Sequence, residues 1–205
     1  MALSAGSPQQ KRPADTRQQT NTRQRTGIRQ HMDKAELRKQ MKQAEKAFLA
    51  SGKQDIETAE IWHRVEESEQ FRNAGTVLIY MDIPGEVPTG DFIRKWHNTK
   101  RIVIPRVNGE MLDLCEYDPQ KMHDGYKGIQ EPTADAAIVN PDEIDLALIP
   151  GVAFTHSGAR LGRGKGFYDR LLPKLKCPCV GIGFSFRWVD EIPTDPWDAP
   201  LRIDV

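Results

Sequence analysis

The sequence of 205 residues predicts an α/β fold, namely a single three-layer domain whose mostly parallel sheet is covered by helices on both faces. Two observations predict this class. Short apolar runs rich in β-branched and aromatic residues, such as TVLIYM at 76–81 and RIVIP at 101–105, are typical of buried strands. Segments with helical periodicity alternate with these runs through short connections, and this alternation is typical of a parallel sheet.

The first helical segment covers residues 33–52. Asp33 and Glu36 have the spacing of a capping box, so the helix is expected to begin there. Its apolar stripe consists of Leu37, Met41, Ala44, Ala47 and Phe48. We expect a second helix at 56–72 and a third that begins at an N-cap, Thr89, and ends near residue 98.

The second half of the chain continues the same alternation. Residues 111–117 alternate in polarity and predict a hairpin partner or an edge strand, whereas 124–132 predicts an irregular loop. The strand at 145–149 leads into a glycine-rich loop, and the helix after that loop is expected to end near Pro173. Residues 179–184 predict another buried strand.

Residues 1–31 differ in composition from the rest. They hold six Lys and Arg against one Asp, which leaves 23 Lys and Arg against 28 Asp and Glu in the remainder. Too few apolar residues are present to offset the entropy cost of ordering, so we expect a disordered basic N-terminal arm at 1–31 and the α/β domain at 32–205. The mildly acidic domain is not a nucleic-acid-binding surface by bulk charge, although the arm leaves an RNA-binding role open.

Cysteine content and hydropathy restrict the location of the protein. Three cysteines, an odd number, are too few for a disulfide framework and fit a reducing compartment. No apolar run reaches the roughly 18–20 residues that span a membrane, and the N-terminus lacks the apolar core of a secretory signal. We therefore expect a cytoplasmic protein with neither a membrane nor a nucleic acid as its partner.

The most informative stretch is the glycine-rich loop and the helix that follows it, at 148–173. Glycines have no Cβ, so the backbone can adopt positive φ and bring its N–H groups against a ligand. Positive charges alternate with these glycines, and a helix N-terminus follows. The glycines are Gly158, Gly162, Gly164 and Gly166, and the cations are Arg160, Arg163 and Lys165. Together they predict a site for a polyanion, most plausibly phosphate.

Neither common phosphate-binding loop matches this stretch. A Walker A loop would need Gly where Ala159 stands and a hydroxyl where Gly166 stands. A dinucleotide fingerprint also fails, because Gly162 and Gly164 are followed by Gly166 and then by Phe167. The alternative is a flexible surface turn without function, and the regular spacing of the cations and Asp169 argues against it.

Two further pairs lie where a ligand site could form. Lys34 and Arg38 lie four positions apart on one helix face, so both can reach one anion, although a solvated charged face has the same pattern. Met81 and Glu86 follow the strand at 76–81, and open α/β sheets place ligands beyond the carboxyl ends of their strands. Without further information Met81 would be a core residue and Glu86 a surface turn residue.

The glycine-rich stretch resembles a known signature. Pro150-Gly151, Phe154 and the run RLGRGKGFYDR at 160–170 are similar to the motif of the 5-formyltetrahydrofolate cyclo-ligase family, also called 5,10-methenyltetrahydrofolate synthetase. The similarity extends from about Lys34 to Asp198. It implies ATP- and Mg²⁺-dependent cyclisation of 5-formyltetrahydrofolate to 5,10-methenyltetrahydrofolate, with release of ADP and phosphate, by an enzyme expected to be a monomer.

The resemblance also implies roles for individual residues. Arg163 and Lys165 are expected to be catalytic, and Asp169 and Asp198 are expected to hold Mg²⁺. The residues implied for ATP are Lys34, Arg38, Arg160, Leu161, Gly162, Arg163, Gly164, Lys165, Gly166, Phe167 and Tyr168. The residues implied for the folate are Met81, Glu86, Tyr126, Arg163, Gly164, Lys165, Gly166 and Phe167. Relatives often have an aromatic residue where this chain has Lys127, which leaves the pterin-stacking residue open, and whether Asp195 assists Asp198 is also open.

The residue types agree with phosphoryl transfer. No Ser-His-Asp or Cys-His arrangement can be recognised in the sequence. An enzyme that catalyses phosphoryl transfer by positioning phosphates and neutralising their charge needs no protein nucleophile. One alternative is an ATP-independent phosphate-binding α/β enzyme of the sugar-phosphate isomerase or acyl-transferase type. Another is an RNA-associated protein that acts through residues 1–31.

Overall fold

The structure is a computed structural model that describes residues 32–125 and 128–201. The arm expected at 1–31 and Tyr126 lie outside the described residues. Within the described part no helix is both long and apolar enough to cross a membrane.

A five-stranded sheet lies at the centre of the fold, with the strand order β3-β2-β1-β6-β9. Its strands are β1 (Thr76–Leu78), β2 (Arg101–Asn108), β3 (Met111–Glu116), β6 (Leu146–Pro150) and β9 (Cys179–Ile182). β1 pairs in parallel with β2 and β6, and β6 pairs in parallel with β9, whereas the edge strand β3 is antiparallel to β2. The sheet is therefore mostly parallel, as the sequence predicts.

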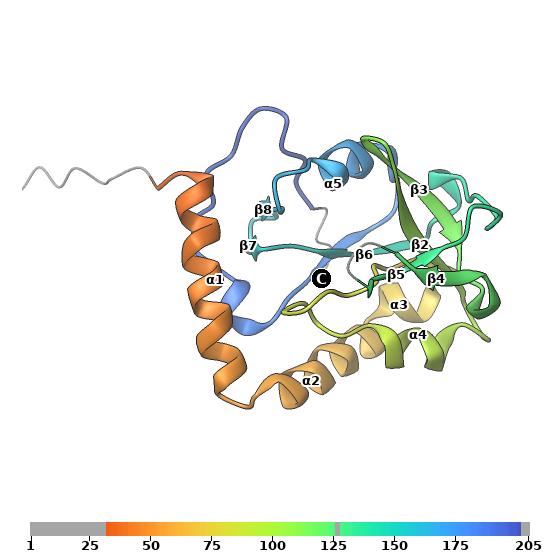
Figure 1. Cartoon of the computed structure of the whole chain (residues 1–205), viewed down its shortest axis with the longest axis horizontal. Coiled ribbons are helices and arrows are strands. Elements are labelled where there is room, and N and C mark those ends of the chain that lie inside the picture. Colours follow the sequence, from red (N-terminus) through yellow and green to blue (C-terminus); the bar gives the residue numbers. More distant parts are fainter. Residues whose placement is uncertain (1–31, 126–127, 202–205) are drawn as a thin grey trace, which may run out of the picture. The chain divides into compact units, whose positions relative to one another are not determined.

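Helices cover both faces of this sheet (Figure 1). On one face lie α2 (Gln54–Glu67), α3 (Glu69–Asn73) and α4 (Gly90–Trp96), and on the other lies α5 (Phe167–Leu171). Consecutive residues of a strand point to opposite faces, so Val77 packs in the first of these layers and Leu78 in the second. The expected three-layer α/β architecture is confirmed.

Helix α1 (Lys34–Ala50) begins as the capping pattern predicts. The side chain of Asp33 accepts a hydrogen bond from Glu36 N over 2.7 Å. Leu37, Met41 and Phe48 are buried, whereas Ala47 is exposed, so the apolar stripe is narrower than predicted. Leu37 and Met41 pack against a short hairpin formed by β7 (Ala153–Phe154) and β8 (Arg160–Leu161), so α1 lies beside the glycine-rich loop.

The prediction of a single helix at 56–72 is wrong, because Ser68 separates two helices, α2 and α3. Ser68 has an extended ψ of 142°, and its hydroxyl donates to Val65 O and accepts from Phe71 N. One serine thus terminates α2 and caps α3, which is the usual competition of a short polar side chain with the helix backbone.

Several other boundaries differ from the sequence prediction. β1 ends at Leu78 and β2 continues to Asn108, while the loop expected at 124–132 contains a two-stranded pair. That pair consists of β4 (Met122–Asp124) and β5 (Gln130–Pro132). Thr89 stands at the start of α4 but does not cap it with its side chain, because its hydroxyl donates to Asp82.

Short 3-10 helices complete the described part of the chain. They are η1 (Pro119–Lys121), η3 (Pro141–Glu143), η4 (Leu172–Lys174) and η5 (Ser185–Arg187). The turn η4 continues α5 past Pro173, in agreement with the predicted end of that helix. Cys115, Cys177 and Cys179 are all buried.

Candidate active site

A cavity of about 260 Å³ opens beyond the carboxyl ends of the parallel strands. Tyr80 and Met81 line it after β1, and Pro150 and Gly151 line it at the end of β6. From β1 the chain continues to β2 on one side of it, whereas β6 lies on the other side. The boundary between β1 and β6 is therefore the topological switch point, where α/β sheets bind ligands. The glycine loop closes the same cavity from residue 160 to residue 169.

The glycine loop has the backbone that its sequence predicts at two of its three central glycines. Gly164 has φ 95° and Gly166 has φ 68°, which side-chain-bearing residues rarely adopt. Gly166 forms the N-cap of α5 in the left-handed conformation, so the chain turns sharply into the helix. Gly162 has no positive φ, but a Cβ there would lie 3.0 Å from Arg160 Nη1, and its carbonyl accepts a hydrogen bond from Arg38 Nε over 2.9 Å.

The three cations of the loop have different environments. Lys165 is exposed and makes no ion pair with any described residue. The side chain of Arg163 is 51% exposed and pairs with Glu86 over 3.1 Å. Arg160 is 3% exposed and donates to Asp169 Oδ1 over 3.0 Å and to Pro150 O over 3.3 Å. Lys165 and Arg163 are therefore accessible to a ligand, whereas Arg160 mainly holds the loop and Asp169 together.

Asp169 lies in the first turn of α5, where the helix dipole favours a negative charge. Arg160 Nη2 contacts Oδ1, and among the described residues no partner is found for Oδ2. Tyr168 beside it packs against the guanidinium of Arg160, 5.3 Å from the ring centre, and burial raises the pKa of its phenol. Phe167, Tyr168 and Asp169 all line the cavity.

Met81 and Glu86, the residues predicted to contact the folate, also line the cavity. The side chain of Glu86 is 10% exposed, and burial raises its pKa, although the charge and hydrogen bonds of Arg163 oppose that shift. Its Oε2 accepts from Ile83 N over 3.3 Å, so the carboxylate also stabilises its own turn. The hydroxyl of Tyr80 donates to Val87 O over 2.9 Å, which anchors the other end of the loop.

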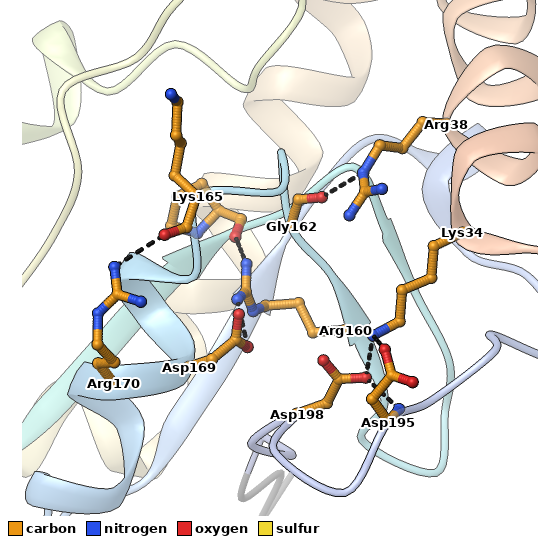
Figure 2. Close-up of polar contacts among 10 residues, drawn as sticks. Lys34, Arg38, Arg160, Gly162, Lys165, Asp169, Arg170, Asp195 and Asp198 are labelled. Carbon is orange, nitrogen blue, oxygen red and sulfur yellow. Dashed lines mark hydrogen bonds and ion pairs between the residues drawn. The ribbon is translucent and has the colours of Figure 1, made fainter. Parts of the chain in front are cut away.

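Lys34 points from α1 toward residues 190–201, here called the C-terminal loop, and Arg38 points toward the glycine loop (Figure 2). Lys34 Nζ lies 2.7 Å from Asp195 Oδ2 and also pairs with Asp198. Burial lowers the pKa of Lys34, but the hydrogen bonds and charges of the two carboxylates outweigh burial and raise it. Asp195 N donates to Asp198 Oδ2 over 2.7 Å, so Asp195 supports Asp198 through its backbone.

The structure thus divides the predicted residues into two groups. One group lines the cavity: Met81, Glu86, Arg160, Gly162, Arg163, Lys165, Gly166, Phe167, Tyr168 and Asp169. The other group, Lys34, Arg38 and Asp198, lies between α1 and the C-terminal loop and is joined to the first by the bond from Arg38 to Gly162. Two predicted residues belong to neither group. Gly164 does not line the cavity and lies near Arg38, whose guanidinium carbon would be 3.7 Å from an added Cβ. The side chain of Leu161 is buried against α1, and its carbonyl accepts from Val152 N.

Several cavity residues were missed by reasoning from the sequence. Pro105, Val107 and Leu112 come from the β2–β3 pair, and Gln130 and Glu131 come from β5. Their position depends on the strand order and on the β4–β5 pair, and no local pattern reports either. Tyr80 could have been found, because it directly precedes Met81 at the carboxyl end of β1.

Comparison with known proteins identifies the family of the chain. The model of the 5-formyltetrahydrofolate cyclo-ligase family matches residues 30–205. A Haemophilus influenzae protein named 5-formyltetrahydrofolate cyclo-ligase is 30% identical over 175 residues, which cover 81% of this chain and 93% of that protein.

Two solved structures have the same fold. An NMR structure of Aquifex aeolicus 5,10-methenyltetrahydrofolate synthetase has a TM-score of 0.74 and 33% identity, covering 83% of this chain and 87% of that one. The Mycoplasma pneumoniae 5,10-methenyltetrahydrofolate synthetase has a TM-score of 0.66 and 31% identity, covering 83% and 96%. The family match, the shared fold and the glycine loop at the switch point together establish that the chain belongs to the 5-formyltetrahydrofolate cyclo-ligase family.

Proposed function

We propose that this enzyme catalyses the ATP- and Mg²⁺-dependent cyclisation of 5-formyltetrahydrofolate to 5,10-methenyltetrahydrofolate, with release of ADP and phosphate. One observation carries the proposal: a single cavity is lined by Met81 and Glu86 on one side and by Arg163, Lys165 and Asp169 on the other. The residues proposed to contact the folate and those proposed to contact phosphate are therefore neighbours, as transfer of a phosphoryl group to the folate requires.

The phosphates of ATP would be held by the glycine loop and by α1. Lys165 is exposed and Arg163 is half exposed, so both can turn to a triphosphate at little cost. Gly164 and Gly166 let the backbone approach the ligand, and α1 presents Lys34 and Arg38 from the other side. Phosphoryl transfer depends mainly on such positioning and charge neutralisation.

The carboxylates fit Mg²⁺ in the chemistry of their donor atoms. Mg²⁺ prefers oxygen ligands and is usually held by one or two carboxylates together with waters and substrate phosphates. Asp169 Oδ2 and Asp198 Oδ1 have no hydrogen-bond partner among the described residues, so each carboxylate keeps an oxygen for a cation. In the described part no group of three or more His, Cys, Asp or Glu is placed so that it could hold a metal ion by itself.

The chain's residues then need only hold the two substrates in line. Transfer of the γ-phosphoryl group to the formyl oxygen makes that oxygen a good leaving group. Attack by N10 on the formyl carbon forms the new C–N bond, and phosphate leaves with the former formyl oxygen while the N10 proton is lost. Bound Mg²⁺ supplies neutralisation of phosphate charge. Arg163 and Lys165 stabilise the transferring group, and this sequence of steps requires no protein nucleophile.

The test is the absorbance of the methenyl product formed from 5-formyltetrahydrofolate by the full chain, with and without ATP. Product only with ATP and Mg²⁺ supports the proposal, and no product with both present would refute it. Nucleotide-dependent thermal stabilisation separates this reaction from that of an ATP-independent phosphate enzyme. Removal of residues 1–31 should leave turnover unchanged, because every proposed residue except Tyr126 lies in the described part of the chain.

We further propose that the enzyme works as a monomer in the cytoplasm. The residues that line the described cavity come from one chain, so the proposed reaction does not require a second subunit. The odd number of cysteines, three in the sequence, fits a reducing compartment. Size-exclusion chromatography with light scattering, with and without substrates, tests the first statement.

A further inference from the structure

Arg187, at the end of η5, is a buried cation next to the candidate site. Its exposed fraction is 2%, and it is not one of the described residues that line the cavity. A buried guanidinium is costly unless its hydrogen bonds and its charge are matched. Its Nε has no partner in the described structure, so this side chain is not fully compensated. Its remaining contacts show what it does.

Three segments that build the site meet at this guanidinium. Nη1 donates to Val152 O over 3.0 Å, and Nη2 donates to Gly85 O over 2.7 Å and to Glu45 Oε2 over 2.6 Å. Gly85 directly precedes the cavity residue Glu86, and Val152 directly follows the cavity residue Gly151. Glu45 belongs to α1, the helix that carries Lys34 and Arg38.

The loop before Glu86 is shaped to fit this ion pair. Gly85 has φ 90°, and a Cβ at this position would overlap the carboxylate of Glu45. The backbone of Gly85 is therefore pressed against Glu45 while its carbonyl faces Arg187. Glu86 is held from both sides, because its carboxylate pairs with Arg163 and the carbonyl before it bonds to Arg187.

We propose that Arg187, with Glu45 as its counter-ion, is a positioning residue that fixes the Gly85–Glu86 turn and thereby sets the affinity for the folate. Arg187 acts through the Gly85 carbonyl and not by contact with substrate. This inference rests on the proposed function for the identity of the substrate, whereas the contact between Arg187 and the turn stands on the structure alone.

The experiment compares Arg187→Gln, Arg187→Lys and Gly85→Ala in the full chain. Arg187→Gln should raise the KM for 5-formyltetrahydrofolate about tenfold and leave kcat within about threefold, since Glu86 is displaced but the phosphate residues stay in place. Arg187→Lys keeps the charge and part of the hydrogen bonding, so its KM should lie between those of Arg187→Gln and the wild type. Gly85→Ala perturbs the turn from the other side and should reproduce the rise in KM even if Arg187→Gln folds poorly.

Asp145→Asn is the control for general loss of stability. Asp145 accepts from Gly75 N and Thr76 N before β1, at the end of the strand opposite the cavity. Its substitution should lower the melting temperature without changing the KM for the folate. If Asp145→Asn raises this KM as much as Arg187→Gln does, or if neither Arg187→Gln nor Gly85→Ala raises it, the inference is wrong.

Hydrogen exchange gives a readout that needs no turnover. The Glu86 amide donates to Ile83 O over 3.0 Å and should exchange faster in Arg187→Gln than in Asp145→Asn. Equal protection in the two variants overturns the positioning role whatever the substrate is. A wild-type chain that forms no methenyl product with ATP refutes the proposed function instead, and the exchange result still decides whether Arg187 holds the turn.

Discussion

Arg163 and Glu86 form an ion pair of 3.1 Å that joins the glycine loop to the turn after β1. The two partners differ in environment, because the Glu86 side chain is 10% exposed and that of Arg163 is 51% exposed. The arginine can therefore change its partner more easily than the glutamate can. In the state described, the cation predicted to bind phosphate neutralises the carboxylate predicted to bind the folate.

This pair predicts a pH dependence of stability. Burial raises the pKa of Glu86 above its ordinary value of 4.5, so the folded protein binds this proton more tightly than the unfolded chain does. Glu86 thus contributes stability below that ordinary pKa, and the contribution is lost as the pH rises through the folded pKa. Glu86→Gln has no ionisable group at this position, so it does not lose this contribution as the pH rises. The melting temperature of Glu86→Gln minus that of the wild type should therefore increase from pH 4.5 to pH 7. Exposed Glu191→Gln is the control, and an equal increase there would contradict the assignment.

Lys165→Ala should abolish activity without unfolding the protein. The side chain is exposed and has no ion pair with the described residues, so its loss should shift the melting temperature by no more than about 2 °C. Loss of a charge that stabilises the transferring phosphoryl group should lower kcat/KM by about 100-fold or more. The exposed Lys174→Ala serves as control. Wild-type turnover in Lys165→Ala would remove this lysine from the mechanism.

Asp169→Asn and Asp198→Asn should weaken Mg²⁺ binding. Asparagine keeps an oxygen that can accept from Arg160 or Lys34, but it removes the negative charge that a divalent cation requires. We expect the Mg²⁺ concentration at half-maximal turnover to rise about tenfold or more in each variant. Calorimetry of ATP binding with and without Mg²⁺ gives a second readout. Asp190→Asn is the exposed control, and an unchanged titration in Asp169→Asn would argue against ligation there.

Gly158→Ala should loosen the C-terminal loop. Gly158 has φ 93°, its carbonyl accepts from Leu201 N over 2.8 Å, and an added Cβ would lie 2.8 Å from Leu201 O. The combined backbone strain and overlap should lower the free energy of unfolding, measured by denaturant titration, by about 2–4 kcal/mol. Gly109→Ala is a matched control, since φ is also positive but no atom lies within 4 Å of the new Cβ. It should cost only about 1–2 kcal/mol. A larger loss in Gly109→Ala would contradict the role of the Leu201 contact.

The fold class and the capping of α1 follow from local patterns, so the sequence alone predicts them well. The division of the helix predicted at 56–72 was missed because Ser68 also satisfies helical periodicity, and its capping bonds appear only when the backbone bends. The β4–β5 and β7–β8 pairs were missed for another reason. Their strands have two or three residues, too few to show alternation.

The candidate site shows the same limit. The glycine loop could be recognised because its glycines and cations are contiguous, and Met81 and Glu86 could be placed because they follow a strand. Lys34 and Asp198 are 164 residues apart, so their contact could not be derived from spacing. Arg187 gave no signal at all, because an arginine in a sequence predicts an exposed residue, and only the tertiary structure supplies the counter-ion and carbonyls that let it be buried.

Trp197, in the turn between Asp195 and Asp198, has 72% of its surface exposed, whereas Trp62 is buried and Trp96 and Trp188 are partly covered. The emission of an indole responds to the polarity and charge of its surroundings. The protein therefore carries an intrinsic fluorescent label on the segment that holds Asp198. Events at that turn can be followed optically in the unmodified chain.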